Sequence, residues 1–85
     1  MWVQQRDYVA IGTVLADARE RAGLTQKQLA KLLRKPQSFI SNYEGGQRRI
    51  DILELIRIAD ALAADPCTIF IDILARQQGA RKKKR

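Results

Sequence analysis

Length, composition and charge restrict the chain to a small class of proteins. Its 85 residues suffice for one domain with a modest core. The chain has no histidine and a single cysteine, which excludes an internal disulfide and removes the most common general base and metal ligand. No apolar run is long enough to cross a membrane, and the amino terminus lacks the pattern of a secretion signal. We therefore expect a cytoplasmic protein that has no cofactor and no catalytic activity.

The formal net charge of +7 is unevenly distributed along the chain. Residues 25–50 carry six basic side chains against Glu44 alone, and residues 81–85 are all basic, whereas residues 51–80 have an acidic excess. Clustered positive charge of this kind is typical of a surface that binds a polyanion such as nucleic acid. The basic end either adds non-specific affinity or only keeps the protein soluble, and the sequence leaves both alternatives open.

Two helices are predicted in the first part of the chain. Apolar residues recur at helical spacing over residues 11–22, and Gly23 follows as the expected carboxy-terminal stop. Thr25 is a favourable cap for the second helix, because Gln28 three residues later completes a capping box. Pro36 ends this helix, since the residue before a proline avoids helical geometry.

Three more helices are predicted after this break. The third runs from Pro36 to about Glu44 and is followed by two glycines. Asp51 opens the fourth helix, and Asp65 with Pro66 opens the fifth. No segment alternates polar and apolar residues as an exposed strand does, so the predicted fold class is all-α. The expected parts of the chain are an amino-terminal extension, a helical domain and a basic, disordered tail at residues 1–8, 9–76 and 77–85.

The third helix has two chemically different sides. At about 100° per residue, one side holds only short amide and hydroxyl side chains: Gln37, Ser38, Ser41 and Asn42. The opposite side is apolar and holds Pro36, Phe39, Ile40 and Tyr43. A helix side that merely meets water is normally rich in lysine and glutamate, whereas glutamine, asparagine and serine can hydrogen-bond base edges. We therefore expect the apolar side to dock on the protein and the polar side to contact bases.

Groups suited to phosphate flank this helix. Six residues are candidates for contacts to a DNA backbone: Gln26, Lys27, Arg34, Lys35, Arg48 and Arg49. Gln26 stands at the start of the second helix, where free backbone N–H groups favour an anion. Protein–DNA interfaces use this arrangement, in which short polar side chains contact bases and the flanking cations contact phosphates.

The segment from Thr25 to Gly46 resembles the helix-turn-helix of lambda-repressor-like regulators of the XRE or Cro type, and the resemblance extends over about residues 9–75. Ala30 occupies the small position where the two helices cross, and Ile40 and Tyr43 occupy apolar positions of the recognition helix. The resemblance implies a five-helix DNA-binding domain in which the second and third helices form the helix-turn-helix.

The same resemblance implies roles for individual residues. Gln37, Ser38 and Asn42 would face bases, and Ser41 would reach a base or a phosphate. Arg34 departs from the family pattern, which often has glycine at this turn. A left-handed backbone there would cost an arginine about 1 kcal/mol, and the alternative is a turn that is built differently before Pro36. The family also implies homodimers on near-palindromic sites, with half-sites about one helical turn apart.

The fifth helix is richer in apolar residues than one buried stripe requires. Phe70, Ile71 and Leu74 are candidates for a homodimer seam, and a well-buried last helix is the alternative. Cys67, in the first turn of this helix, is expected to pack among apolar neighbours as a small residue.

These features predict sequence-specific binding of double-stranded DNA by a homodimeric transcriptional regulator, either a repressor or an autoregulator. The alternative is an antitoxin or protein-interaction module that binds a partner protein and represses its own operon. No set of residues suggests an enzyme.

Overall fold

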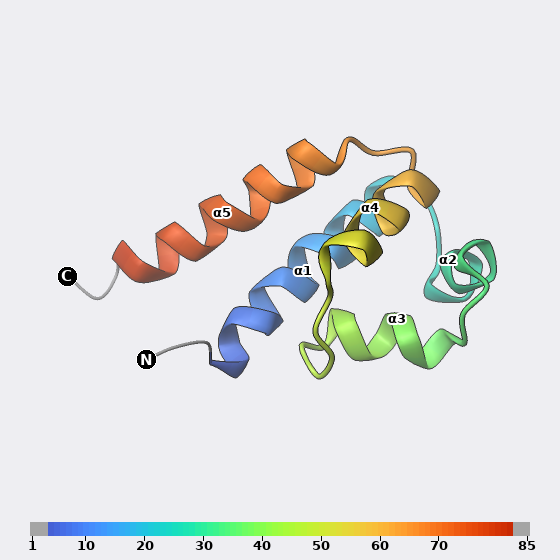
Figure 1. Cartoon of the computed structure of the whole chain (residues 1–85), viewed down its shortest axis with the longest axis horizontal. Helices are drawn as coiled ribbons and strands as arrows, with labels where there is room; N and C mark the ends of the chain where they lie inside the picture. The colour runs from blue at the N-terminus through green and yellow to red at the C-terminus, as the bar shows by residue number, and fades with distance from the viewer. Residues whose placement is uncertain (1–3, 83–85) are drawn as a thin grey trace.

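A computed structural model describes the backbone of residues 4–82 and the side chains of residues 4–77. Within these residues it contains five helices and no strand (Figure 1). The helices are α1 (Gln5–Arg21), α2 (Gln26–Leu33), α3 (Gln37–Glu44), α4 (Ile52–Ala61) and α5 (Pro66–Lys82). The predicted all-α, five-helix fold is thereby confirmed. None of these helices has the length and apolar character that a bilayer crossing requires.

Local capping determines where α2 and α4 begin. The Thr25 hydroxyl accepts a hydrogen bond from the Gln28 N–H at 3.0 Å, and the Gln28 side chain accepts one from the Thr25 N–H at 2.9 Å. Asp51 and Glu54 form the same reciprocal pair at the start of α4. Both starts agree with the sequence, because a capping box acts within a single turn.

α1 and α5 are both longer than the sequence predicted. α1 begins at Gln5, where the Asp7 carboxylate accepts a hydrogen bond from the N–H of the preceding cap residue at 2.9 Å. α5 continues to Lys82, so residues 77–82 are helical, which corrects the expected disordered tail. Gln77 Nε2 donates to the Asp7 carbonyl oxygen at 3.2 Å and thereby joins the two extensions. The basic side chains expected to act from this tail lie outside the described residues.

A left-handed residue connects α2 to α3. Arg34 has φ 58° and ψ 43°, the conformation for which glycine is the usual choice. The Lys35 N–H then donates to the Ala30 carbonyl at 3.0 Å, and Pro36 caps α3 in an extended conformation. The helix-turn-helix thus keeps the left-handed turn, although an arginine there costs about 1 kcal/mol.

The core is shared by all five helices. Its largest fully buried side chains come from α1 to α4: Leu15, Leu29, Ile40, Tyr43 and Ile58. α5 adds Ile69 and Ile73 and runs antiparallel beside α1, on the side opposite to α3 (Figure 1). Gly12 lets α1 approach the end of α3 closely, because a Cβ at this position would overlap the carbonyl oxygens of Tyr43 and Glu44. α3 therefore packs closely against α1, which holds it in position.

Candidate nucleic-acid interface

α3 presents the polar side that the sequence predicted. Ile40 and Tyr43 are buried on its inner side, and the half-buried Phe39 ring lies edge-on to Tyr43 with 5.4 Å between ring centres. The four expected base-contacting residues are all exposed: Gln37, Ser38, Ser41 and Asn42. The helix is therefore two-sided, with short amides and hydroxyls facing the solvent.

A little-exposed ion pair holds the end of α3 against α1. Arg19 Nε lies 2.7 Å from Glu44 Oε2, and Arg19 Nη2 donates to Glu44 Oε1 at 3.1 Å. Only 11% of the Arg19 side chain and 7% of the Glu44 side chain are exposed. The third donor of the guanidinium, Nη1, bonds the Leu24 carbonyl at 2.8 Å. The hydrogen bond to Glu44 raises the pKa of Arg19, which favours the charged form of this pair.

The same carboxylate positions two side chains at the surface. Gln26 Nε2 donates to Glu44 Oε1 at 2.9 Å, and Gln26 Oε1 accepts a hydrogen bond from Gln37 Nε2 at 3.3 Å. Each end of the Gln26 amide thereby has one partner, and one N–H of its NH2 group remains for another acceptor. Gln37 keeps one amide N–H and its carbonyl oxygen for another partner. This chain of contacts could not be predicted from local sequence patterns, because Arg19 and Glu44 lie 25 residues apart.

Three of the expected phosphate contacts are exposed cations on the α2 side of α3. Lys27, Arg34 and Lys35 all face solvent. The Lys35 ammonium lies 5.4 Å from the centre of the Phe39 ring, within the range of a cation–π contact. These residues place positive charge at the amino-terminal end of the polar side.

Arg48 and Arg49 have different environments although they are neighbours. Arg48 Nη1 and Nη2 donate to the two Glu54 oxygens at 3.1 and 2.9 Å, and its guanidinium lies 4.5 Å from the centre of the Phe39 ring. The hydrogen bonds between them raise the pKa of Arg48 and lower the pKa of Glu54. Arg49 is exposed and makes no ion pair with the side chains of residues 4–77. Arg49 is therefore available to an anion, whereas Arg48 already has a carboxylate partner.

Comparisons with known proteins decide the family. Residues 15–69 match the helix-turn-helix family model. An XRE-family like protein from Pseudomonas syringae is 37% identical, over 82% of this chain and 85% of that one, with a TM-score of 0.73. The chain belongs to the XRE family of helix-turn-helix proteins.

Two further structures are similar to this XRE-family protein. The restriction-modification controller protein C.AhdI from Aeromonas hydrophila is 31% identical over 76% of this chain and 94% of that one, with a TM-score of 0.71. The clp gene regulator ClgR from Corynebacterium glutamicum shares the fold, with a TM-score of 0.80 at 23% identity over 92% of this chain and 84% of that one. A search of curated protein sequences finds no significant match. The XRE-family protein is thus a DNA-binding regulator with a helix-turn-helix formed by α2 and α3.

The XRE-family protein exposes apolar side chains on α5. Phe70, Ile71 and Leu74 are 48%, 61% and 41% exposed, so they are available for the expected seam. The buried side of α5 is made by Ile69 and Ile73. Cys67 is exposed, which corrects the expectation that it packs inside. The reason is its register, since two helical residues turn through about 200° and Cys67 therefore points away from Ile69.

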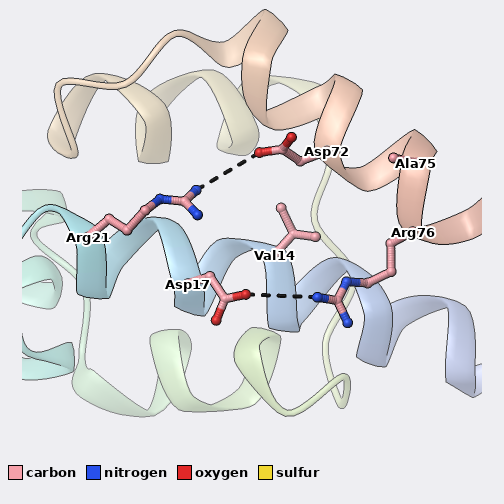
Figure 2. Close-up of a pocket in the computed structure, with 6 residues that line it drawn as sticks. All are labelled: Val14, Asp17, Arg21, Asp72, Ala75 and Arg76. Carbon is pink, nitrogen blue, oxygen red and sulfur yellow. Dashed lines mark ion pairs between the residues drawn. The ribbon is translucent and has the colours of Figure 1, made fainter.

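A groove lies between α1 and α5, away from α3 (Figure 2). Its volume is about 440 Å³, and two ion pairs cross it. These pairs are Arg21–Asp72 and Arg76–Asp17, each with 3.9 Å between nitrogen and oxygen. At this separation the contacts are Coulombic rather than hydrogen-bonded. The four charges neutralise one another, so this groove does not add to the positive surface around α3.

Proposed function

We propose that the protein is a sequence-specific transcriptional regulator that binds operator DNA as a homodimer and reads the major groove with α3. The observation that carries the proposal is the exposed side of α3, with Gln37, Ser38, Ser41 and Asn42. Glutamine and asparagine pair bidentately with adenine, and serine can donate or accept a hydrogen bond at a base edge. Because Glu44 and Gln26 orient Gln37, part of this surface is organised before DNA arrives.

Positive groups around α3 would contact the phosphates. Lys27, Arg34 and Lys35 stand on one side and Arg49 on the other, and the first backbone N–H groups of α2 at Gln26 add an anion site. Such contacts supply affinity without sequence information. Arg48 would act indirectly, because its ion pair with Glu54 braces the loop that carries Arg49.

The exposed apolar residues of α5 support a homodimer. Phe70, Ile71 and Leu74 project from a helix that lies on the opposite side of α1 from α3, so a seam there need not cover the reading surface. One copy of α3 contacts too few base pairs to select a site in a genome, whereas two copies on near-palindromic half-sites double the contacts. The likeness to a restriction-modification controller protein supports a regulatory outcome, for which we propose repression or autoregulation in the cytoplasm.

Selection of bound duplexes from a random pool at physiological salt tests this function. We expect a consensus with two-fold symmetry. Asn42→Ala should weaken binding to the selected duplex by about 1–3 kcal/mol and leave binding to random DNA unchanged. Lys27→Ala is the matched control, because loss of a phosphate contact weakens both equally. Equal losses for Asn42→Ala on the two duplexes would contradict base reading by α3, and an asymmetric consensus would contradict the homodimer.

A further inference from the structure

The first turn of α1 forms a cleft with the loop that follows α3. Its volume is about 410 Å³, and Gln4, Gln5 and Tyr8 line one wall. The facing wall includes Gln47 and Arg49. The α1 wall precedes residues 15–69, which match the helix-turn-helix family model. The α1 wall of the cleft therefore lies outside the part of the chain that matches the family model.

Backbone contact fixes the two walls relative to each other. Gly46 has φ +79°, and a Cβ at this position would lie 2.8 Å from the Val9 Cα. No side chain therefore fits between the loop and α1 at this point. The first turn of α1 is also tied to α5, through the hydrogen bond from Gln77 to the Asp7 carbonyl. The cleft is consequently preorganised, which reduces the entropy lost when a ligand enters.

The lining has the chemistry of a phosphate site. Arg49 is exposed and has no carboxylate partner among residues 4–77, and its guanidinium lies 6.0 Å from the centre of the Tyr8 ring. This distance is at the limit of a cation–π contact, so the guanidinium stands beside the Tyr8 ring. Apart from Arg48, which Glu54 neutralises, the remaining polar groups are amides and a phenol. One available cation among neutral donors suits the singly charged phosphodiester of DNA.

The cleft continues the reading surface of α3. The Gln47 N–H donates to the Asn42 carbonyl at 2.8 Å, so the loop wall begins where α3 ends, beside the amino-terminal end of α1 (Figure 1). A helix with its side chains is about 10–12 Å in diameter and the major groove is about 12 Å wide, so phosphates flank a helix that lies in the groove. With α3 in the groove, groups just beyond its end would therefore lie near these phosphates.

We propose that this cleft binds one phosphodiester of the operator backbone. Arg49 pairs with the phosphate, and Tyr8 beside it donates its hydroxyl to a phosphate oxygen. The inference rests on the proposed function, because it requires α3 to lie in the groove. It adds a backbone contact from α1, outside the helix-turn-helix, which would fix the angle at which α3 enters the DNA.

Affinity and its salt dependence on the selected duplex test the cleft. Arg49→Gln should lower affinity about tenfold and reduce the salt slope by about 0.9. Tyr8→Phe should lower affinity about threefold without changing the slope, because only a neutral donor is lost. Arg6→Gln is the matched control, since it removes the same charge from an exposed residue of the same turn that does not line the cleft. Equal effects of Arg49→Gln and Arg6→Gln would overturn the proposal.

A scan of single neutral methylphosphonates along the selected duplex locates the contact. Wild-type protein should lose affinity at one phosphate flanking each half-site, and Arg49→Gln should be insensitive to that substitution. If wild-type protein selects a sequence but Arg49→Gln retains the full methylphosphonate pattern, the cleft proposal fails while the proposed function stands. If wild-type protein binds no duplex from the pool, both fail.

Discussion

Ion pairs lie on two opposite sides of α1, and they differ in length, in hydrogen bonding and in exposure. Toward α3, Arg19 and Glu44 meet at 2.7 Å with 11% and 7% of their side chains exposed. The pairs toward α5 are longer and at least 45% exposed on each side chain: Arg21–Asp72 and Arg76–Asp17, both at 3.9 Å (Figure 2). Of the ion pairs on these two sides of α1, only Arg19–Glu44 is hydrogen-bonded.

The difference matters because solvent determines what an ion pair contributes. Arg19 is satisfied by Glu44 and by the Leu24 carbonyl, and Glu44 also accepts from Gln26, so neither charge is left bare. Exposed pairs without hydrogen bonds gain little, since water and salt screen them. α3 is therefore held to α1 by geometry-dependent bonds, whereas α5 is held mainly by apolar packing.

The largest expected effect is at Glu44. Glu44→Ala should lower the free energy of unfolding by about 3 kcal/mol, because Arg19 would keep a little-exposed charge without its partner. Urea denaturation measures this loss. Glu20→Ala is the control, since Glu20 lies 3.9 Å from the same guanidinium but is 68% exposed, and it should cost less than about 0.5 kcal/mol. Similar losses for the two variants would contradict the larger contribution of the less exposed, hydrogen-bonded partner.

An intermediate effect is expected at Glu54, and it depends on pH. Hydrogen bonds from Arg48 and from the Asp51 N–H lower the pKa of Glu54 below its ordinary value of 4.5. A lowered pKa in the folded state stabilises the fold above the ordinary pKa, and this contribution is lost as the pH falls through the folded value. Glu54→Gln should therefore cost about 1 kcal/mol at pH 7 and less at acid pH. A cost that stays constant down to pH 3 would contradict an ionic contribution.

Tyr43 provides a test in the opposite direction. Its hydroxyl is buried and has no hydrogen-bond partner among the described residues, and burial, with the nearby Glu44 charge, raises its pKa. Tyr43→Phe removes a buried polar group that makes no bond, so stability should rise by up to about 1 kcal/mol. Thermal unfolding at pH 7 measures the change. A clear loss of stability would mean that the hydroxyl has a partner, such as an internal water.

The smallest effect is expected in the α1–α5 groove. Asp17→Asn combined with Asp72→Asn breaks both ion pairs and should change the free energy of unfolding by less than about 0.5 kcal/mol. The difference should vanish in 1 M salt, where the Debye length is about 3 Å. A loss comparable to that of Glu44→Ala would show that α5 depends on these bridges.

The features that could be predicted from the sequence are those that depend on residues close together in the chain. The starts of α2 and α4 were predicted from Thr25 and Asp51, because capping acts within one turn. The two-sided nature of α3 was predicted because helical periodicity alone sorts its residues. The left-handed turn at Arg34 was anticipated only through the family resemblance, since arginine itself gives no such signal.

Contacts between residues far apart in the chain could not be predicted from such local signals. The Glu54 partner of Arg48 could not be predicted, because it lies beyond a loop whose path the sequence does not specify. The end of α5 was misjudged because Gln77 was interpreted as the start of a polar tail, whereas it bonds the Asp7 carbonyl, 70 residues earlier. The role of Glu44 in orienting Gln26 has the same origin, since only the packed helices bring the two together.

Gly12 has a mechanical consequence for recognition. With no side chain at this position, the backbone of α1 rests directly on the carbonyl groups that end α3. A close-packed contact of this kind deforms little, so α1 and α3 move together as one rigid unit. Any force that displaces α1 along α5 is therefore transmitted to the orientation of the recognition helix rather than absorbed between them.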